Sequence, residues 1–431
     1  MRMERRLKID FTWVLAGNIF YSACQWMIVV VLAKLGTPEK LGEYAWGLAV
    51  SAPIVLFANF QLRSLLASDL TDRFRFRQYV IFRLISIGAA LGLVAVVAEV
   101  AGSGEKATVV ILVGAAQAVE LVSEIFYGLM QREDRMDRIS RSLMYRGGLS
   151  LASMATTMYF TRSIVWALAA LFLSRLFILF TWDASFAPVK SALRIAPSEN
   201  HDWMPALFRT ALPLGVISML VSLNANVTRY FVEAHRGSAE LGMYSAVASL
   251  LSAGTLVVSA YGQALFLPVA KACVSANRAE FRKFALLTVI LGAILGTCAI
   301  LISILFGRAI LTHLFRPEYG QYADILVRLM IAGTLAFIAA GLGFVMTAAR
   351  SLRPQVPLLV ITGAATVVCS AFLIPRYGLM GAADASILAA AVQLAGTAVI
   401  LRRIDRRFDR IPASGPVVDD LPVQIVEVEA V

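Results

Sequence analysis

The feature that most constrains this chain is a series of apolar runs of about 18 to 28 residues, separated by short charged stretches. A helix that crosses a bilayer needs roughly 20 consecutive apolar residues. Hydrophobic residues make up 59% of the chain and charged residues 16%, and the mean hydropathy is +0.75. A soluble domain carries about 25% charged residues. We therefore predict an all-α polytopic membrane protein.

The apolar runs predict about twelve transmembrane helices. They occupy residues 11–35, 44–67, 79–100, 107–131, 143–161, 163–182, 206–233, 241–269, 284–306, 323–348, 356–375 and 380–401. The amino-terminal run follows the basic stretch "MRMERRLKID", but it is too long for a signal peptide and lacks a small-residue cleavage site. We expect it to be an uncleaved first span.

The distribution of basic residues predicts the orientation. With the amino terminus inside, the cytoplasmic segments carry about three times as many lysines and arginines as the outer loops. Both termini are therefore expected to be cytoplasmic. The formal net charge of +11 is accounted for by this topology signal, so it does not indicate nucleic-acid binding.

A short phrase occurs twice in the chain. "LGEYA" begins at residue 41 and "LGMYS" at residue 241, and "GAALG" at 88–92 is followed by "GAILG" at 292–296. Six predicted spans separate the two occurrences, so both run in the same direction across the membrane. Transporters are often built from such repeats. We predict two parallel-repeat six-helix bundles, residues 1–182 and 206–401, with a cytoplasmic linker at 183–205 and a disordered cytoplasmic tail at 402–431.

Several predicted spans carry polar side chains at helical spacing, which places them on one face. Because charged groups are unfavourable in the bilayer centre, such residues favour a functional cavity. The stripes comprise Asn18, Ser22 and Gln25 in the first span, Asn59 and Arg63 in the second, Gln117, Glu120, Glu124, Tyr127 and Gln131 in the fourth, and Ser218, Ser222, Asn226, Arg229 and Glu233 in the seventh.

The alternative is that these residues only form interhelical hydrogen bonds or extend toward the headgroups. This alternative is favoured for Arg83 and Arg146, which lie close to cytoplasmic span ends. A cavity is favoured for Glu120, Glu124 and Arg175. Arg63 is compatible with both interpretations, and Arg328 and Asp384 receive no role.

Signatures of soluble enzymes are missing from the sequence. It has no phosphate-binding glycine loop followed by lysine and no cluster of metal-ligand residues. The four cysteines lie in spans or at a cytoplasmic edge, which gives no extracellular disulfide framework. We expect a transporter without a cofactor, not an enzyme.

Three stretches resemble the oligosaccharide and O-antigen flippases of bacterial polysaccharide biosynthesis, which belong to one superfamily with multidrug and toxin extrusion exporters. They are "LGEYAWGLAVSAPIVLFANFQLRSLLASD" at 41–69, "VELVSEIFYGLMQREDRMDRISRSLMYRGGLS" at 119–150, and "LGMYSAVASL" at 241–250. The second is the most specific. It matches the family pattern at Glu124, Tyr127, Gly128, Gln131, Arg135, Met136, Asp137, Ile139, Ser142, Gly148 and Ser150, and "QLR" matches at residues 61–63.

The resemblance implies a V-shaped transporter like the multidrug and toxin extrusion (MATE) proteins, in the bacterial inner membrane. It would move an undecaprenyl-diphosphate-linked oligosaccharide from the inner to the outer leaflet by alternating access. We expect Arg63, Arg175 and Arg146 to bind the head group on the inner side and Arg229 to bind it on the outer side. Asn18, Gln25, Asn59 and Asn226 would line the path, and Glu120, Glu124 and Glu233 would balance charge or hold a coupling cation, H⁺ or Na⁺.

Two other functions stay open at this point. A cation-coupled multidrug exporter would share the architecture but favour an acidic or aromatic cavity, and a membrane-embedded glycan polymerase or acyltransferase would also use buried arginine and acid pairs. The expected partners are the lipid-linked oligosaccharide, membrane lipids, a polysaccharide polymerase and glycosyltransferases, and no nucleic acid. The protein is expected to be a monomer.

Overall fold

The computed structural model describes residues 2–69, 73–102, 104–186, 202–275, 277–349, 351 and 354–408. For residues 2–12, 101 and 407 the structure describes the backbone alone. The chain divides into two compact units, Met1–Leu223 and Asn224–Val431. We describe each unit by itself.

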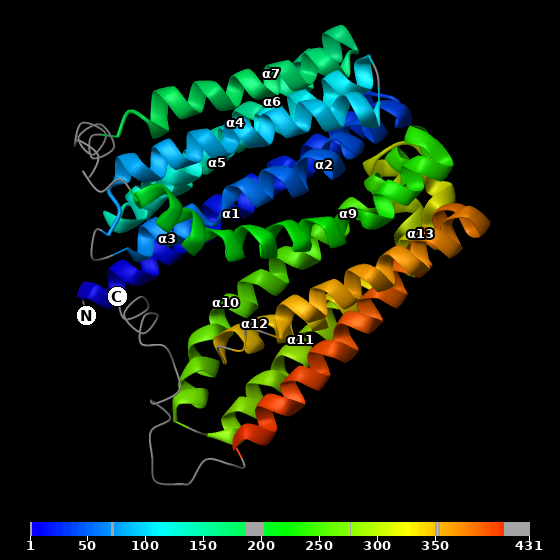
Figure 1. Cartoon of the computed structure of the whole chain (residues 1–431). Helices are drawn as coiled ribbons and strands as arrows, with labels where there is room; N and C mark the ends of the chain where they lie inside the picture. The colour runs from blue at the N-terminus through cyan, green and yellow to red at the C-terminus, as the bar shows by residue number, and fades with distance from the viewer. Residues whose placement is uncertain are drawn as a thin grey trace. The chain divides into compact units, whose positions relative to one another are not determined.

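Helices lying side by side make up the first unit (Figure 1). They are α1 (Arg2–Leu35), α2 (Pro38–Asn59), α3 (Leu62–Ser68), α4 (Phe76–Ala101), α5 (Glu105–Arg132), α6 (Met136–Thr161) and α7 (Ile164–Ile178), and α7 continues as the π-helical turn η1 (Leu179–Asp183). The helix α9 (Trp203–Ser249) begins in this unit and contains the division between the units.

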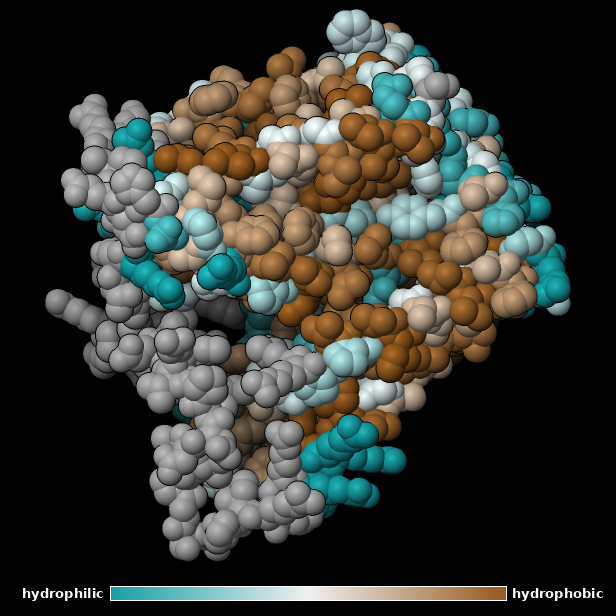
Figure 2. Space-filling model, in the orientation of Figure 1, coloured by the Kyte–Doolittle hydropathy of each residue, from teal (hydrophilic) through white to brown (hydrophobic). Residues whose placement is uncertain are grey.

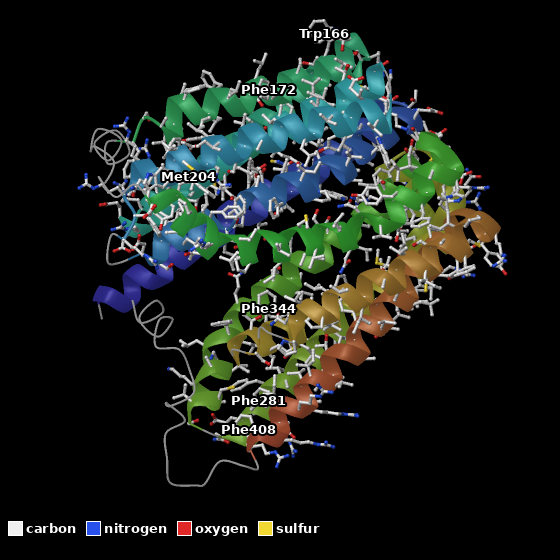
Figure 3. All side chains as sticks on the ribbon, viewed as in Figure 1. Trp166, Phe172, Met204, Phe281, Phe344 and Phe408 are labelled. Carbon is white, nitrogen blue, oxygen red and sulfur yellow. The ribbon has the colours of Figure 1, made fainter. Side chains whose placement is uncertain are left out.

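The second unit continues with α10 (Leu251–Val274), α11 (Arg278–Leu314), the 3-10 turn η2 (Pro317–Tyr322), α12 (Ala323–Ala348) and α13 (Gln355–Arg407). Phe281 and Phe408 pack together where α11 begins and α13 ends, with ring centroids 5.3 Å apart (Figure 3). Phe344 of α12 packs against Gly262 of α10, where an added Cβ would lie 2.3 Å from the ring. Small residues thus allow close approach of helices that lack a strong hydrophobic driving force in lipid.

The described helices agree with twelve membrane crossings. Among the described residues, nine stretches are long and apolar enough to cross a membrane, and two of these are too long for one crossing, at 72 and 52 residues. Each of the two contains a glycine with positive φ, Gly237 (φ 81°) and Gly378 (φ 57°), where one helix ends and the next begins. Glycine adopts this backbone region without the steric cost of a Cβ. The more polar 26-residue helix α6 supplies the remaining crossing.

The central helix of each unit occupies an equivalent place in the chain. In the first unit α5 contacts α2, α3, α4, α6 and α7, and in the second unit α12 contacts α10, α11 and α13. More than half of the apolar window of each helix is buried. They are the fourth and tenth crossings, six apart, as a parallel repeat requires.

The repeated phrase also has the same local environment in both units. Leu41 and Tyr44 are buried near the start of α2, and Leu241 and Tyr244 are buried just after the break at Gly237. The second match behaves differently. Gly292 and Gly296 pack closely against α12, whereas a Cβ at Gly88 or Gly92 would meet nothing within 4 Å.

Brown, hydrophobic side chains cover much of the coloured face in Figure 2. Large hydrophobic side chains are exposed along α4, α7 and α11, including Val96, Phe177, Ile294 and Leu305. A soluble protein would not expose such extended apolar faces. The chain is therefore a multi-pass membrane protein.

The predicted bundle boundaries and the helix ends differ in detail. η1 reaches Asp183, α9 begins at Trp203, and α13 continues to Arg407, six residues into the predicted tail. Most of the predicted linker and the tail beyond residue 408 lie outside the described residues.

Candidate functional site

The polar stripe of α5 contacts a different helix at nearly every position. Gln117 accepts a hydrogen bond from Ser51 of α2 (3.2 Å), Tyr127 is bonded to Ser142 of α6 (2.7 Å), and Gln131 accepts one from Arg63 of α3 (3.4 Å). α5 is the central helix of the first unit, so its polar residues connect the surrounding helices. The stripe predicted as one wall of a cavity is the hub of a polar network.

Glu120 is the carboxylate at the middle of this network. Its Oε2 accepts a hydrogen bond from Arg175 Nη1 of α7 at 3.1 Å, and its Oε1 accepts one from the hydroxyl of Tyr21 of α1. Arg175 also donates to the carbonyl of Ala116 at 3.0 Å. Arg175 is 6% exposed and Glu120 is 27% exposed, so this pair is partly open on the carboxylate side.

Arg146 forms a second ion pair that is fully closed off. Its Nη2 donates to Asp183 Oδ2 at 2.8 Å, and both side chains are 0% exposed. Ser142 donates to the other oxygen of Asp183 at 2.5 Å. Removing one partner of such a pair leaves a buried uncompensated charge, which is strongly unfavourable. Because its side chain is fully buried against Asp183, Arg146 does not extend to the headgroups.

Arg83 is bonded to the backbone of α2. Its Nη1 donates to the carbonyl of Ala58 at 3.0 Å and its Nη2 donates to Asn59 Oδ1 at 3.1 Å. The side chain is 1% exposed. Glu124 of α5 interacts electrostatically with Arg83 and offsets its charge. Arg83, like Arg146, is a buried structural group and not a side chain that reaches toward the interface.

Arg63 differs from these three arginines. It is half-buried in the first turn of α3, its Nε donates to Gln131, and its guanidinium carbon lies 5.6 Å from the ring centroid of Tyr127. Within the described part of the chain, Arg63 forms no ion pair. Among the described residues, neither of its terminal NH₂ groups donates a hydrogen bond.

Residues of the family motif converge on Arg63. The guanidinium carbons of Arg63 and Arg146 lie 5.6 Å and 5.5 Å from the ring centroid of Tyr127. Gln131 accepts a hydrogen bond from Arg63. Gly128 lets α3 approach α5, because an added Cβ would lie 3.1 Å from the carbonyl oxygen of Arg63. The motif thus specifies how α5 holds the start of α3.

The polar residues of α1 lie apart from these ion pairs. Asn18 is exposed, and Gln25 is partly buried with its amide nitrogen enclosed. Of the α1 residues, it is Tyr21, absent from the predicted polar stripe, that reaches the network.

The candidates of the second unit form short local contacts. Arg229 donates to Asn226 Oδ1 at 2.9 Å, and Ser238 donates to Glu233 Oε1 at 2.7 Å. Asn226 and Glu233 are buried. Arg328 and Asp384 form an ion pair with a contact of 2.7 Å, which satisfies both charges.

Charge and ligand type restrict what the first unit can bind. Four arginines lie around α5 (63, 83, 146 and 175), against the three carboxylates Glu120, Glu124 and Asp183. In the described part of the chain, no group of three or more His, Cys, Asp or Glu residues is arranged to hold a metal ion. This set has one more arginine than carboxylates, and Glu124 interacts electrostatically with both Arg83 and Arg63. A net positive charge suits an anionic ligand.

Sequence reasoning misses three members of this network. Asp183 follows an apolar run, so the hydropathy pattern places it at the start of the linker. Tyr21 does not belong to the polar stripe of its span, and Ser142 stands out only as a motif residue. An acid within one helical turn of a span end, with an arginine in a neighbouring span, is the signal that could have found Asp183.

Comparison with known proteins finds a relative that is named for capsular polysaccharide biosynthesis. No family model matches the chain. The sequence is 28% identical over 376 residues to the capsular polysaccharide biosynthesis protein CapF of Staphylococcus aureus, covering 87% of this chain and 94% of CapF.

Solved structures share the fold. The lipid II flippase MurJ in an inward closed conformation has a TM-score of 0.67 at 12% identity, covering 91% of this chain and 89% of MurJ. A mutant of the Vibrio cholerae MATE transporter VcmN has a TM-score of 0.63 at 12% identity, covering 94% and 97%. The sequence similarity to CapF and the structural similarity to MurJ and VcmN confirm the family resemblance that the motifs predict. The structural similarity also confirms the predicted MATE-like polytopic fold.

Proposed function

We propose that this chain, with its resemblance to the polysaccharide and multidrug exporters of one superfamily, is a flippase for a lipid-linked oligosaccharide. It moves an undecaprenyl-diphosphate-linked repeat unit of O-antigen, capsule or exopolysaccharide from the inner to the outer leaflet of the bacterial inner membrane by alternating access. Support comes from the relative CapF, named for capsular polysaccharide biosynthesis, and from the fold shared with MurJ, named as a lipid II flippase.

The observation that carries the proposal is the state of Arg63. Of the four arginines named around α5, Arg146 is held by Asp183, Arg175 by Glu120 and Arg83 by the carbonyl of Ala58. Arg63 donates only through its Nε, to Gln131, so in this proposal its two NH₂ groups receive the ligand. A guanidinium can bond two oxygens of a diphosphate at once, which suits this planar fork better than an ammonium. The sugars need hydrated contacts, while the polyprenyl chain stays in lipid.

The remaining residues take supporting roles in this proposal. Arg175 and Arg146, whose charges are paired with Glu120 and Asp183, hold the helices around Arg63 on the inner side, and Arg229 is the outer counterpart. Asn18, Gln25, Asn59 and Asn226 line the path. Glu120, Glu124 and Glu233 balance charge, and the partly exposed Glu120 is the best placed to hold a coupling cation, H⁺ or Na⁺. Both termini face the cytoplasm, and a glycosyltransferase and a polymerase act before and after this step.

The test is complementation of a strain whose own copy of the gene is deleted. Arg63→Ala removes a charge-assisted hydrogen bond worth about 1.5–3 kcal/mol, so surface polysaccharide is expected to fall about ten- to a hundredfold. Lipid-linked single repeat units should accumulate facing the cytoplasm. Arg63→Lys, which keeps the charge but loses the fork, should retain intermediate export.

Arg77→Ala is the matched control, because Arg77 is an exposed arginine in the first turn of α4. It should export normally. Repeat units accumulating on the outer face would instead indicate a polymerase. If the deletion strain kept its normal amount of surface polysaccharide and became more susceptible to drugs, the chain would be a multidrug exporter and the proposal would be overturned.

A further inference from the structure

The second membrane crossing, Pro38–Ser68, is broken in its last third. α2 ends at Asn59, Phe60 and Gln61 have φ angles of 48° and 51°, and α3 begins at Leu62. Two consecutive residues other than glycine in the left-handed region are uncommon, and they persist only where surrounding contacts enforce them. The break also leaves the last carbonyls of α2 without partners inside the helix.

Buried backbone groups at the end of a helix need partners from elsewhere in the fold. Arg83 of α4 supplies these bonds, to the Ala58 carbonyl at 3.0 Å and to the Asn59 side chain at 3.1 Å. The Ser86 hydroxyl donates to the Arg83 carbonyl at 2.9 Å and lies 3.3 Å from the carbonyl of Ala58. Arg83 and Ser86, one turn apart on α4, therefore both contact the carboxyl end of α2.

The neighbouring side chain on α4 holds the other part of the break. The ring of Phe82 packs against Phe60 with centroids 5.4 Å apart, and Phe57 and Phe208 pack against the same ring at 5.0 and 5.9 Å. An added Cβ at Gly215 would lie 2.8 Å from this ring. Phe60 is thus enclosed, and the turn has little freedom to rotate.

The break is connected directly to Arg63. Leu62 is fully buried, and the backbone of Arg63 lies against Gly128 of α5. Only two turn residues and Leu62 separate the end of α2 from Arg63. The direction in which the Arg63 side chain leaves α3 therefore depends on the geometry of the turn.

We propose that Arg83 is a positioning residue: by bonding the broken end of α2, it fixes the Phe60–Gln61 turn and so places Arg63 for the head group. This inference rests on the proposed function for its effect on export, but the placement itself is testable without it. Arg83 does not contact the substrate in this scheme.

The placement is tested with a thiol probe at the turn. Gln61 is exposed, so Gln61→Cys in a chain with Cys24, Cys273, Cys298 and Cys369 replaced by Ala or Ser gives one reactive site. The rate at which this probe thiol reacts with a maleimide reagent is measured in native membranes with Arg83, with Arg83→Met, and with Arg77→Met. Arg77 lies six residues earlier on α4, is exposed and receives the same substitution, so it is the matched control.

The expected result is a change of at least fivefold in the reaction rate of the probe thiol in Arg83→Met and no change in Arg77→Met. Export in the complementation assay should fall at least tenfold in Arg83→Met, and Arg83→Lys should restore part of both readouts because an ammonium still reaches one carbonyl. If Arg83→Met fails to accumulate in the membrane, the comparison uses Arg83→Lys and Asn59→Ala, each of which removes one of the two bonds.

The two proposals fail in distinguishable ways. An unchanged rate of the probe thiol in Arg83→Met, or in both substitute variants, overturns the positioning role whatever Arg63 does. A changed rate of the probe thiol with normal export by Arg63→Ala upholds the positioning of the turn and contradicts the role of Arg63 in transport.

Discussion

Replacing Asp183 with alanine should be among the most destabilising single substitutions in the first unit. The substitution removes the carboxylate bonded to Arg146 at 2.8 Å and to Ser142 at 2.5 Å, in a place where both charged side chains are 0% exposed. Breaking a buried ion pair from one side costs about 3–5 kcal/mol, because the remaining charge stays buried without compensation. We expect a loss of that size in the free energy of unfolding.

The double substitution Arg146→Met with Asp183→Leu should be far less harmful than the single one. Apolar residues of similar volume remove both charges, and such replacements are often neutral. Ser142 then loses only its acceptor, Asp183 Oδ1, which costs about 1–3 kcal/mol, and it keeps its hydrogen bond with Tyr127. The double variant should therefore recover stability relative to Asp183→Ala.

The assay is equilibrium unfolding of the purified chain in mixed micelles with increasing sodium dodecyl sulfate, followed by tryptophan fluorescence. Trp182 is a suitable reporter because it adjoins Asp183 and packs against Tyr145 with ring centroids 5.0 Å apart. Asp137→Ala is the control, since its ion pair with Arg135 is partly exposed and such pairs contribute about 0–1 kcal/mol. A loss below about 1 kcal/mol in Asp183→Ala, or a double variant less stable than the single one, would refute this reasoning.

Two further predictions concern the family motif. Gly128→Ala should reduce export about fivefold, because its Cβ would lie 3.0 Å from Leu66 and 3.1 Å from the Arg63 carbonyl, and overpacking costs about 1–3 kcal/mol. Gly148→Ala is the control and should export normally, because its Cβ would come no nearer than 3.9 Å to Phe20. Equal export by the two variants would contradict the proposed packing. The hydrogen bond from Arg135 holds the pKa of Asp137 below its ordinary value of 3.8. The pair therefore stabilises the folded chain fully above pH 3.8, and this stabilisation is lost as the pH falls through the lower pKa of the folded state. The stability difference between the chain and Asp137→Asn should be the same at pH 7 and pH 5 and shrink in acid, and a difference that changes between pH 5 and pH 7 would show that another group is responsible.

The membrane crossings were predictable because their physical cause is local. Apolar runs of bilayer length determine where helices cross, so the predicted spans fall on the observed helices from α1 to α13, although several helices extend beyond them, as α11 does at Arg278–Leu314 against the predicted 284–306. The repeat was detectable for the same reason, since Tyr44 and Tyr244 stand at equivalent buried positions in their helices. The glycine phrases at 88–92 and 292–296 show the limit of this reasoning, because identical spacing there goes with different packing.

The pairing of charges was not predictable from spacing. Arg146 and Asp183 are 37 residues apart, and Arg175 and Glu120 are 55 apart, so their contacts depend on how α5, α6 and α7 pack. Arg83 is near a predicted span end, which suggests extension toward the headgroups, but the break in α2 supplies it with carbonyl partners. The break itself has no glycine or proline to indicate it.

The most direct test of the account is transport by the purified chain in proteoliposomes. The substrate is a fluorescent saccharide linked to undecaprenyl through a diphosphate, and the measurement is its rate of appearance in the opposite leaflet. The account predicts that wild-type chain accelerates this transfer, that Arg63→Ala is slower by about tenfold or more, and that a monophosphate-linked analogue is carried poorly because it offers the guanidinium fewer oxygens. Equal rates for wild type and Arg63→Ala would contradict the claim that Arg63 receives the head group.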